Sequence, residues 1–122
     1  MDHPNAKETL QMRDILAQLA PAAATETLLY DCPRQTLADI DSVMSCNRGT
    51  TGDTVRVSIS KAGVATSNAD YLYYDLPIDG NDTHLAAIGL VARAGDIVRV
   101  RSTLGTCSFT LLGDVAKPVP DR

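Results

Sequence analysis

Few residues of the sequence are arranged for catalysis. The histidines are His3, close to the N-terminus, and His84, beside the turn-like stretch D-G-N-D-T. Serines are frequent, but none stands in a G-x-S-x-G elbow or a similar context that would support a Ser/His/Asp triad. We therefore interpret His84 as a surface histidine. The sequence predicts no catalytic site and no bound cofactor.

The densest acidic group contains Asp75, Asp79 and Asp82, with Asn81 among them. Oxygen ligands in a loop are what calcium requires. However, the spacing does not match an EF-hand loop, and D-G-N-D is also a turn composition. We favour a turn over a metal site, and we keep Asp79, Asn81 and Asp82 as weak calcium candidates.

Three tyrosines lie close together at positions 71, 73 and 74. Such a group can stack on sugars, but the chain has no Trp and one Phe. Strand alternation predicts Tyr71 and Tyr73 on one face and Tyr74 on the other. Packing in a core or an interface therefore explains them more simply than carbohydrate binding does.

The cysteines form no metal-binding pattern. Cys32, Cys46 and Cys107 include no C-x-x-C pair and have no histidine nearby, which argues against zinc. Their odd number excludes a framework in which every thiol is paired within the chain. The simplest interpretation is three small apolar residues in the core.

The sequence G-D-T-V-R-V (52–57) returns as G-D-I-V-R-V (95–100). A phosphate-binding loop would continue into a helix, whereas both copies run into β-branched residues. Two copies are also too few for a solenoid. We interpret the repeat as a device that leads a loop into a strand. Gly permits an unusual φ, Asp bonds to a turn amide, and the valines point inward. The four valines are Val55, Val57, Val98 and Val100.

The composition is that of an ordinary globular protein. The chain has 122 residues, enough for one domain, with 21% charged residues and a formal net charge of −4. The arginines are scattered singly, so the basic stripe of a nucleic-acid-binding protein is lacking. No apolar run approaches the roughly 20 residues of a membrane helix, and no signal-peptide pattern is present. We expect a soluble protein made in a cytosol, without a nucleic-acid or membrane partner.

Short runs of β-branched and aromatic residues between turns predict a mainly β fold. We expect a single antiparallel, jelly-roll-like β-sandwich of seven or eight strands, with an N-terminal arm or short helix. The expected division is an arm and linker (1–25), the sandwich (26–116) and a C-terminal tail (117–122). The predicted strands are 26–31, 36–46, 54–61, 71–76, 83–88, 97–102 and 106–115.

The N-terminal segment 5–20 has the pattern of an amphipathic helix. Asn5 can cap it, and Pro21 ends it. Its apolar face consists of Met12, Ile15, Leu16 and Leu19, at spacings of 0, 3, 4 and 7. We expect these residues to bind another subunit. On this interpretation, a chain without residues 1–20 stays folded but no longer assembles.

Several stretches, in their order along the chain, carry a family resemblance. They are T-L-L-Y-D-C-P (27–33), S-C-N-R-G (45–49), V-R-V-S-I (55–59), Y-L-Y-Y-D-L-P-I-D-G-N-D-T (71–83), A-G-D-I-V-R-V (94–100) and S-F-T-L-L-G (108–113). Together they resemble a family of small tailed-bacteriophage virion proteins, over about residues 21–115. The departures from the family pattern are Ala17, where a glycine is frequent, and the thiols of Cys32 and Cys107.

The resemblance implies a non-enzymatic, symmetric β-sandwich component of a virion that is made in the host cytoplasm. It is expected to be a capsid decoration (cement) protein or a collar or neck protein, with a baseplate or fibre attachment as a further position. Expected partners are its own copies, in a trimer or higher ring, and other virion proteins such as the major capsid or neck proteins. The alternatives are a calcium- or carbohydrate-binding module for host adhesion on the tail or baseplate, and a small enzyme.

A virion context gives the unusual thiols a possible role. Cys32 is expected at a strand end and Cys107 after a turn, so both could lie near the surface, whereas Cys46 is expected to be buried. Lysis releases a virion into an oxidising exterior, where exposed thiols of adjacent subunits can pair. One hypothesis is therefore an intersubunit disulfide at Cys32 or Cys107, and the other is that both fill core space.

Overall fold

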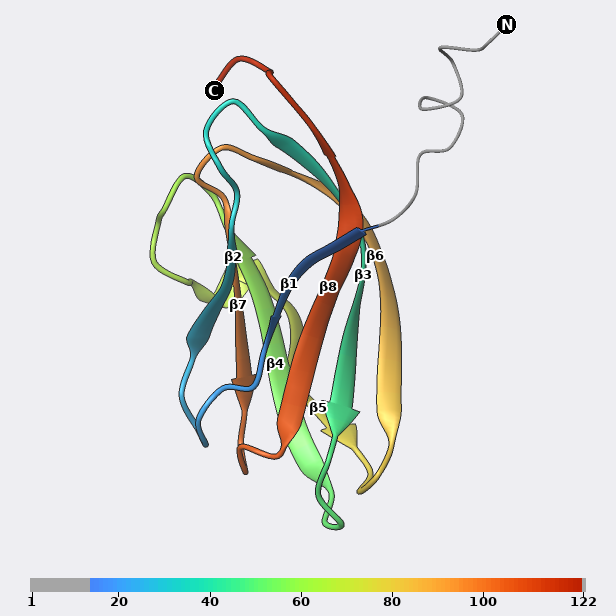
Figure 1. Ribbon diagram of the computed structural model, residues 1–122. Coiled ribbons are helices and arrows are strands. Elements are labelled where there is room, and N and C mark those ends of the chain that lie inside the picture. The colour runs from blue at the N-terminus through green and yellow to red at the C-terminus, as the bar shows by residue number, and fades with distance from the viewer. Residues whose placement is uncertain (1–13, 122) are drawn as a thin grey trace, which may run out of the picture.

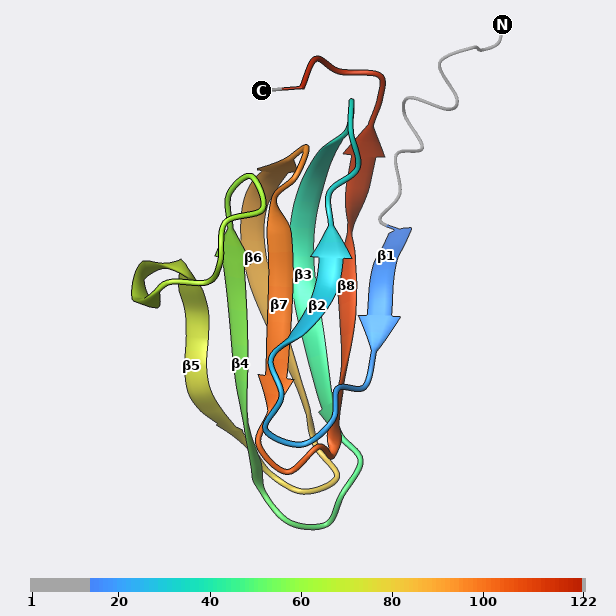
Figure 2. The same cartoon turned by 90° about the vertical axis from the view of Figure 1, so that its left-hand side faces the viewer.

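The computed structural model describes residues 14–121. Eight strands form two four-stranded antiparallel sheets that pack face to face (Figures 1 and 2). The strands are β1 (Asp14–Leu19), β2 (Thr27–Asp31), β3 (Leu37–Asn47), β4 (Asp53–Ser60), β5 (Tyr71–Ile78), β6 (Thr83–Arg93), β7 (Ile97–Ser102) and β8 (Cys107–Ala116). A short 3-10 helix, η1 (Asn68–Asp70), precedes β5.

The strand order is that of a jelly roll. The sheets have the orders β1-β8-β3-β6, here called the β1 sheet, and β2-β7-β4-β5, here called the β2 sheet. The pairs β4–β5, β3–β6, β2–β7 and β1–β8 are nested, as if one long antiparallel hairpin had been rolled into two layers. The expected antiparallel, jelly-roll-like sandwich is therefore confirmed.

The core lies between the two sheets and follows the two-residue period of the strands. Phe109 and Leu111 of β8 and Val55 and Val57 of β4 all belong to this core and are buried. Val98 and Val100 of β7 are buried as well, so both V-R-V segments place their valines inward, as the alternation predicted. Every strand expected from the sequence is present. The strand ends lie close to those expected, except in β6, which extends to Arg93.

The expected helix over residues 5–20 is wrong for the part that the structure describes. Residues 14–19 form β1, which pairs antiparallel with β8 at the edge of the β1 sheet and so belongs to the sandwich. Leu16 and Leu19 pack against the core of their own chain, whereas Ile15 points outward and is 55% exposed. Met12 lies outside the described residues. This segment forms a strand because pairing with β8 satisfies the backbone hydrogen-bonding groups at the edge of the sheet. The apolar spacing of the segment reflects only its local preference, which this pairing overrides.

The segment after β8 returns to the sandwich. The amide of Val119 donates to the carbonyl of Gln35 (2.9 Å). The carboxylate of Asp121 accepts hydrogen bonds from the amide of Gln35 and from Nε of Arg34 (3.1 Å). These bonds lower the pKa of Asp121. The C-terminal tail thus lies against the β2–β3 connection.

A pair of substitutions distinguishes the strand from the helix at the N-terminus. Leu19→Ala should lower the free energy of unfolding by about 2 kcal/mol, because it removes side-chain volume packed on Phe109 and its neighbours. Ile15→Ala should cost less than about 0.5 kcal/mol, since this side chain faces outward. Urea unfolding of both variants measures the difference. Equal losses of stability in the two variants would instead favour the helix, in which both residues lie on the same apolar face.

Candidate functional site

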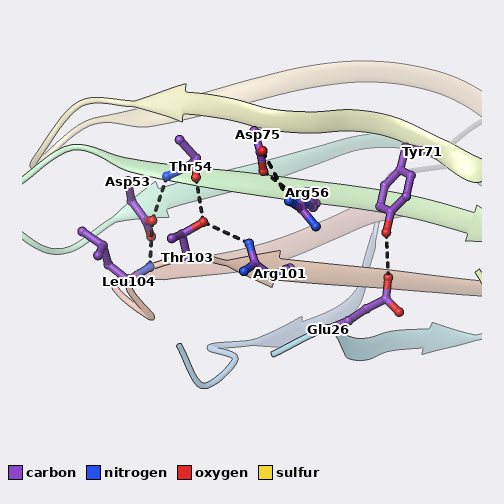
Figure 3. Close-up of polar contacts among 9 residues, drawn as sticks. All are labelled: Glu26, Asp53, Thr54, Arg56, Tyr71, Asp75, Arg101, Thr103 and Leu104. Carbon is purple, nitrogen blue, oxygen red and sulfur yellow. Dashed lines mark hydrogen bonds and ion pairs between the residues drawn. The ribbon is translucent and has the colours of Figure 1, made fainter. Parts of the chain in front are cut away.

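Two buried carboxylates lie at opposite ends of the β4–β7 pair. Asp53 begins β4 and Asp96 directly precedes the antiparallel β7, and both are 3% exposed. Asp53 accepts hydrogen bonds from the amides of Thr54 (2.7 Å) and Leu104 (2.9 Å) and from the hydroxyl of Ser102 (Figure 3 shows the amide contacts). Leu104 lies in the turn after β7. The carboxylate therefore joins the start of one strand to the end of its neighbour.

Asp96 does the same at the other end. Its carboxylate accepts hydrogen bonds from the amide of Ala62 (3.0 Å), in the turn after β4, and from the amide of Arg93 (2.9 Å), at the end of β6. The repeated G-D-x-V-R-V is thus one structural device used twice, as the sequence predicted. The glycines differ, however. Gly95 has φ +86°, whereas Gly52 has no positive φ, so the expected special backbone conformation holds for Gly95 alone.

Asn47 fixes the loop beside Asp53. It is completely buried, and its Nδ2 donates to the carbonyls of Thr51 (2.9 Å) and Ile78 (3.1 Å). Its Oδ1 accepts hydrogen bonds from the amide of Gly49 (3.0 Å) and the hydroxyl of Thr106 (2.8 Å). Both ends of the side-chain amide are therefore fully used in holding the β3–β4 loop against the ends of β5 and β8.

A second group of polar residues covers the outer face of the β2 sheet (Figure 3). Arg56 of β4 pairs with Asp75 of β5 (Nε to Oδ1, 2.7 Å), and its guanidinium lies 4.0 Å from the ring centroid of Tyr74. The rings of Tyr71 and Tyr74 pack in a T shape with centroids 4.9 Å apart. The hydroxyl of Tyr71 reaches across β4 and β7 to Glu26, 3.5 Å away.

Two further arginines extend this face over β7. Arg101 is the direct cross-strand partner of Arg56 and donates to the hydroxyl of Thr103 (3.0 Å). Arg99 donates to the hydroxyl of Ser60 (2.8 Å). In the described part of the chain, neither Arg99 nor Arg101 forms an ion pair with a carboxylate. The face therefore combines aromatic rings with an excess of positive charge.

The sequence alternation misplaced the tyrosines of β5. Tyr71 and Tyr73 were expected on one face, but Tyr71 lies on the outer face and Tyr73 packs against the core. The cause is a register shift in which Tyr73 pairs with Val57 and Tyr71 with Ser58. Because two residues of β5 oppose one step of β4, the bulge turns Tyr71 to the other side.

The calcium candidates form a turn between β5 and β6. Asn81 has φ +57°, and its amide donates to the carbonyl of Gly49 (2.8 Å). Asp82 accepts a hydrogen bond from the amide of Thr83 (2.8 Å), and Asp79 is exposed. Among residues 14–121, no group of three or more His, Cys, Asp or Glu side chains is placed to hold a metal ion. These contacts are those of a hydrogen-bonded loop.

The thiols are placed opposite to expectation. Cys32 and Cys107 are 2% and 0% exposed, and Cys46 is half-buried. Burial raises the pKa of Cys32, and burial together with the nearby carboxylate of Asp53 raises that of Cys107 to about 11. The expectation that Cys32 and Cys107 lie near the surface is therefore wrong, because both side chains point between the sheets. This removes the basis for an intersubunit disulfide at either position.

His84, expected on the surface, is half-buried and packs in a T shape against Tyr73, with ring centroids 5.9 Å apart. His3 lies outside the described residues. A hollow of about 360 Å³ opens near the start of β5 and is lined by Ile59, Leu72 and Leu90, among other residues. Its ionisable groups are Lys61, Asp70 and Asp96. The carboxylate of Asp96 is held by the amides of Ala62 and Arg93.

Arg101 and Asn47 were not among the functional candidates expected from the sequence. Arg101 had a detectable signal, because R-V-R places Arg99 and Arg101 on the same outward face of a strand. Its position opposite Arg56 depends on the pairing of β4 with β7, which spacing alone does not specify. Asn47 had only a weak signal, as an amide directly after a strand and before a glycine-containing loop.

Comparison with known proteins does not extend these observations. No family model, no curated protein and no solved structure matches the chain. In residues 14–121, no helix is long and apolar enough to cross a membrane.

The environment of Asp53 predicts how stability depends on pH. Burial alone would raise the pKa of Asp53, but the hydrogen bonds from Ser102, Leu104 and Thr54 outweigh it and hold the pKa below the ordinary 3.8. The ionised carboxylate therefore stabilises the fold above the ordinary pKa, and this contribution is lost as pH falls through the lowered value.

At pH 7, Asp53→Asn should reduce the free energy of unfolding by roughly 2 kcal/mol, since the amide cannot accept all of these bonds. The difference in unfolding free energy between this variant and the unsubstituted chain should become smaller as pH falls toward 2. Asp79→Asn, in an exposed loop, is the control and should change stability by less than about 0.5 kcal/mol. A gap that stays constant with pH would contradict the assigned role of the Asp53 charge.

Thiol alkylation tests the burial of the cysteines. In the folded protein at pH 8, iodoacetamide should modify Cys46 faster than Cys32 and Cys107, because the latter two are enclosed and their pKa values are raised. Peptide mass spectrometry after timed quenching gives each rate. The urea-unfolded chain is the control, in which all three should react at similar rates. Rapid modification of Cys32 or Cys107 in the folded protein would show that they are accessible.

Proposed function

We propose that the protein is a non-enzymatic structural component of a bacteriophage virion, as a capsid decoration (cement) protein or a collar or neck protein. It assembles with its own copies and binds other virion proteins such as the major capsid or neck proteins. The observation that carries this proposal is the different placement of two groups of side chains. Buried polar groups hold loops and strand ends, while large and charged side chains are displayed on the two sheet faces.

The buried polar residues support a scaffold function. Asp53, Asp96 and Asn47 have the residue types that catalysis often uses, but each has its oxygen atoms engaged by backbone amides or neighbouring hydroxyls. A catalytic acid or base must instead reach a substrate. The geometry of these residues therefore fits a rigid module that is used for its surface.

The exposed faces support binding to protein surfaces. On the β1 sheet, Ile15, Leu85 and Val91 are more than half exposed, and on the β2 sheet Tyr74 is 58% exposed and Leu28 also points outward. These apolar side chains are available for burial against a partner surface. The resemblance of residues 21–115 to phage virion proteins makes a particle the preferred setting.

The N-terminal segment contributes to this surface in a different way from the sequence prediction. Ile15 is available to a neighbouring subunit, whereas Leu16 and Leu19 already pack on their own core. Deletion of residues 1–20 would therefore remove β1 itself and uncover β8. A proposed role of this segment in assembly rests on Ile15 and on residues that precede β1, including Met12.

Carbohydrate adhesion is less well supported by the same face. A sugar-stacking platform needs a free aromatic face. The Arg56 guanidinium covers one face of the Tyr74 ring, and Tyr71 packs against the same ring. The rings are thus engaged with each other and with arginine.

Particle composition tests the proposed function. Virions of the phage that encodes the chain should be purified on a density gradient and analysed by quantitative mass spectrometry. We expect many copies of the chain per particle, co-sedimenting with the major capsid protein. An abundant soluble phage enzyme serves as the control and should remain in the lysate. Recovery of this chain only in the soluble fraction would contradict the proposal.

A further inference from the structure

The two outer faces carry like-charge pairs of opposite sign on their central strands. On the β2 sheet, Arg56 and Arg101 are direct cross-strand partners on the central strands β4 and β7. On the β1 sheet, Asp39 and Asp114 are direct partners on the central strands β3 and β8. Like charges directly opposite each other destabilise a sheet. The chain therefore bears this cost on both of its faces.

The acidic pair has no ion-pair partner within the described chain, whereas the arginine pair is partly neutralised. Asp39 and Asp114 form no ion pair among residues 14–121, and Arg101 donates a hydrogen bond to the neutral hydroxyl of Thr103. Asp75 forms an ion pair with Arg56, which lowers the pKa of Asp75, and the charge of Arg101 lowers it further. A hollow of about 200 Å³ is lined by both acidic side chains. It gives a guanidinium group access to two carboxylates at once, which is a favourable geometry for arginine.

We propose that copies of the chain associate head to tail, with the outer face of the β1 sheet of one copy on the outer face of the β2 sheet of the next. This inference rests on the self-assembly in the proposed function and names the surfaces that carry it. The acidic pair Asp39/Asp114 meets the arginines of the neighbouring copy. Charge complementarity of this kind selects the partner and its orientation.

The apolar side chains of the two faces are suited to the same contact. In the β1 sheet, Leu85, Met44 and Thr110 lie in one cross-strand row, and Ile15 pairs with Leu112 in the next. Leu28 and Tyr74 project from the facing sheet. Burial of these apolar side chains would contribute favourable free energy to the association without fixing its geometry, and the charge pairs would determine the orientation of the two copies.

Because the two faces differ, the contact is heterologous. Two associated copies leave one unused face of each kind, so association continues until a ring closes or a filament forms. A face-to-face dimer through two identical surfaces would instead bring like charges together. The geometry therefore favours a closed ring or an extended stack of copies.

Charge-reversal variants of the full chain test the arrangement. Arg101→Glu reverses a charge on one face and leaves the other intact, and Asp114→Lys does the opposite. Each variant alone should associate at least about tenfold more weakly than the unsubstituted chain. Sedimentation velocity over a concentration series measures this. Each substitution replaces an internal like-charge pair by an opposite pair, so thermal unfolding should show no loss of stability.

The decisive sample is an equal mixture of the two variants. The intact acidic face of Arg101→Glu can dock on the intact arginine face of Asp114→Lys, so the mixture should associate more strongly than either variant alone. Arg48→Glu, which makes the same charge change as Arg101→Glu at an exposed position in the β3–β4 loop, should associate like the unsubstituted chain. Association of the unsubstituted chain should also weaken as salt is raised.

The outcomes separate this inference from the proposed function. If the unsubstituted chain assembles but Arg101→Glu and Asp114→Lys assemble equally well, the head-to-tail contact is wrong while self-assembly stands. If both variants are monomeric and their mixture stays monomeric, the pairing of the two faces is also wrong. An unsubstituted chain that is monomeric at every concentration would overturn the self-assembly on which both depend.

Discussion

The structure depends on how the central pair β4–β7 is held at its two ends by buried carboxylates. A carboxylate that loses water must be compensated by hydrogen bonds, and Asp53 and Asp96 obtain them from backbone amides of the turns that they close. Each carboxylate thereby joins the beginning of one strand to the chain segment that leaves the other. The repeated G-D-x-V-R-V sequence thus supplies one buried aspartate at each end of the antiparallel pair.

The register of this pair determines the functional surface. With Asp53 beside the end of β7 and Asp96 beside the end of β4, the inward valines meet in the core and Arg56 must lie opposite Arg101. The nested order of the jelly roll then places the other central pair, β3–β8, in the opposite layer, where Asp39 lies opposite Asp114. The same pairing that builds the core thus places an arginine pair on one face and an aspartate pair on the other.

Much of the fold could be predicted because its strands alternate regularly. The inward valines of β4 and β7 and the antiparallel sandwich followed from the two-residue period and the turn residues. Residues 14–19 did not, since their apolar spacing also fits a helix and only the free edge of β8 selects a strand. Tyr71 was misplaced because a bulge interrupts the alternation.

The candidate site was less predictable than the fold, because it consists of relations between distant residues. The burial of Cys32 and Cys107 depends on both layers of the sandwich, and the sequence near each one resembles a loop end. The opposition of Arg56 and Arg101 needs the β4–β7 register, and that of Asp39 and Asp114 needs the β3–β8 register. Local patterns identify which residues point outward but not which residues they face.

The most direct test of the account is a cryo-electron microscopy map of the parent particle that resolves individual strands. We expect adjacent copies of the chain with the outer face of the β1 sheet of one against the outer face of the β2 sheet of the next, and Arg101 near Asp39 or Asp114 of its neighbour. Copies that touch only through the ends of the sandwich, with both outer faces open to solvent, would contradict it.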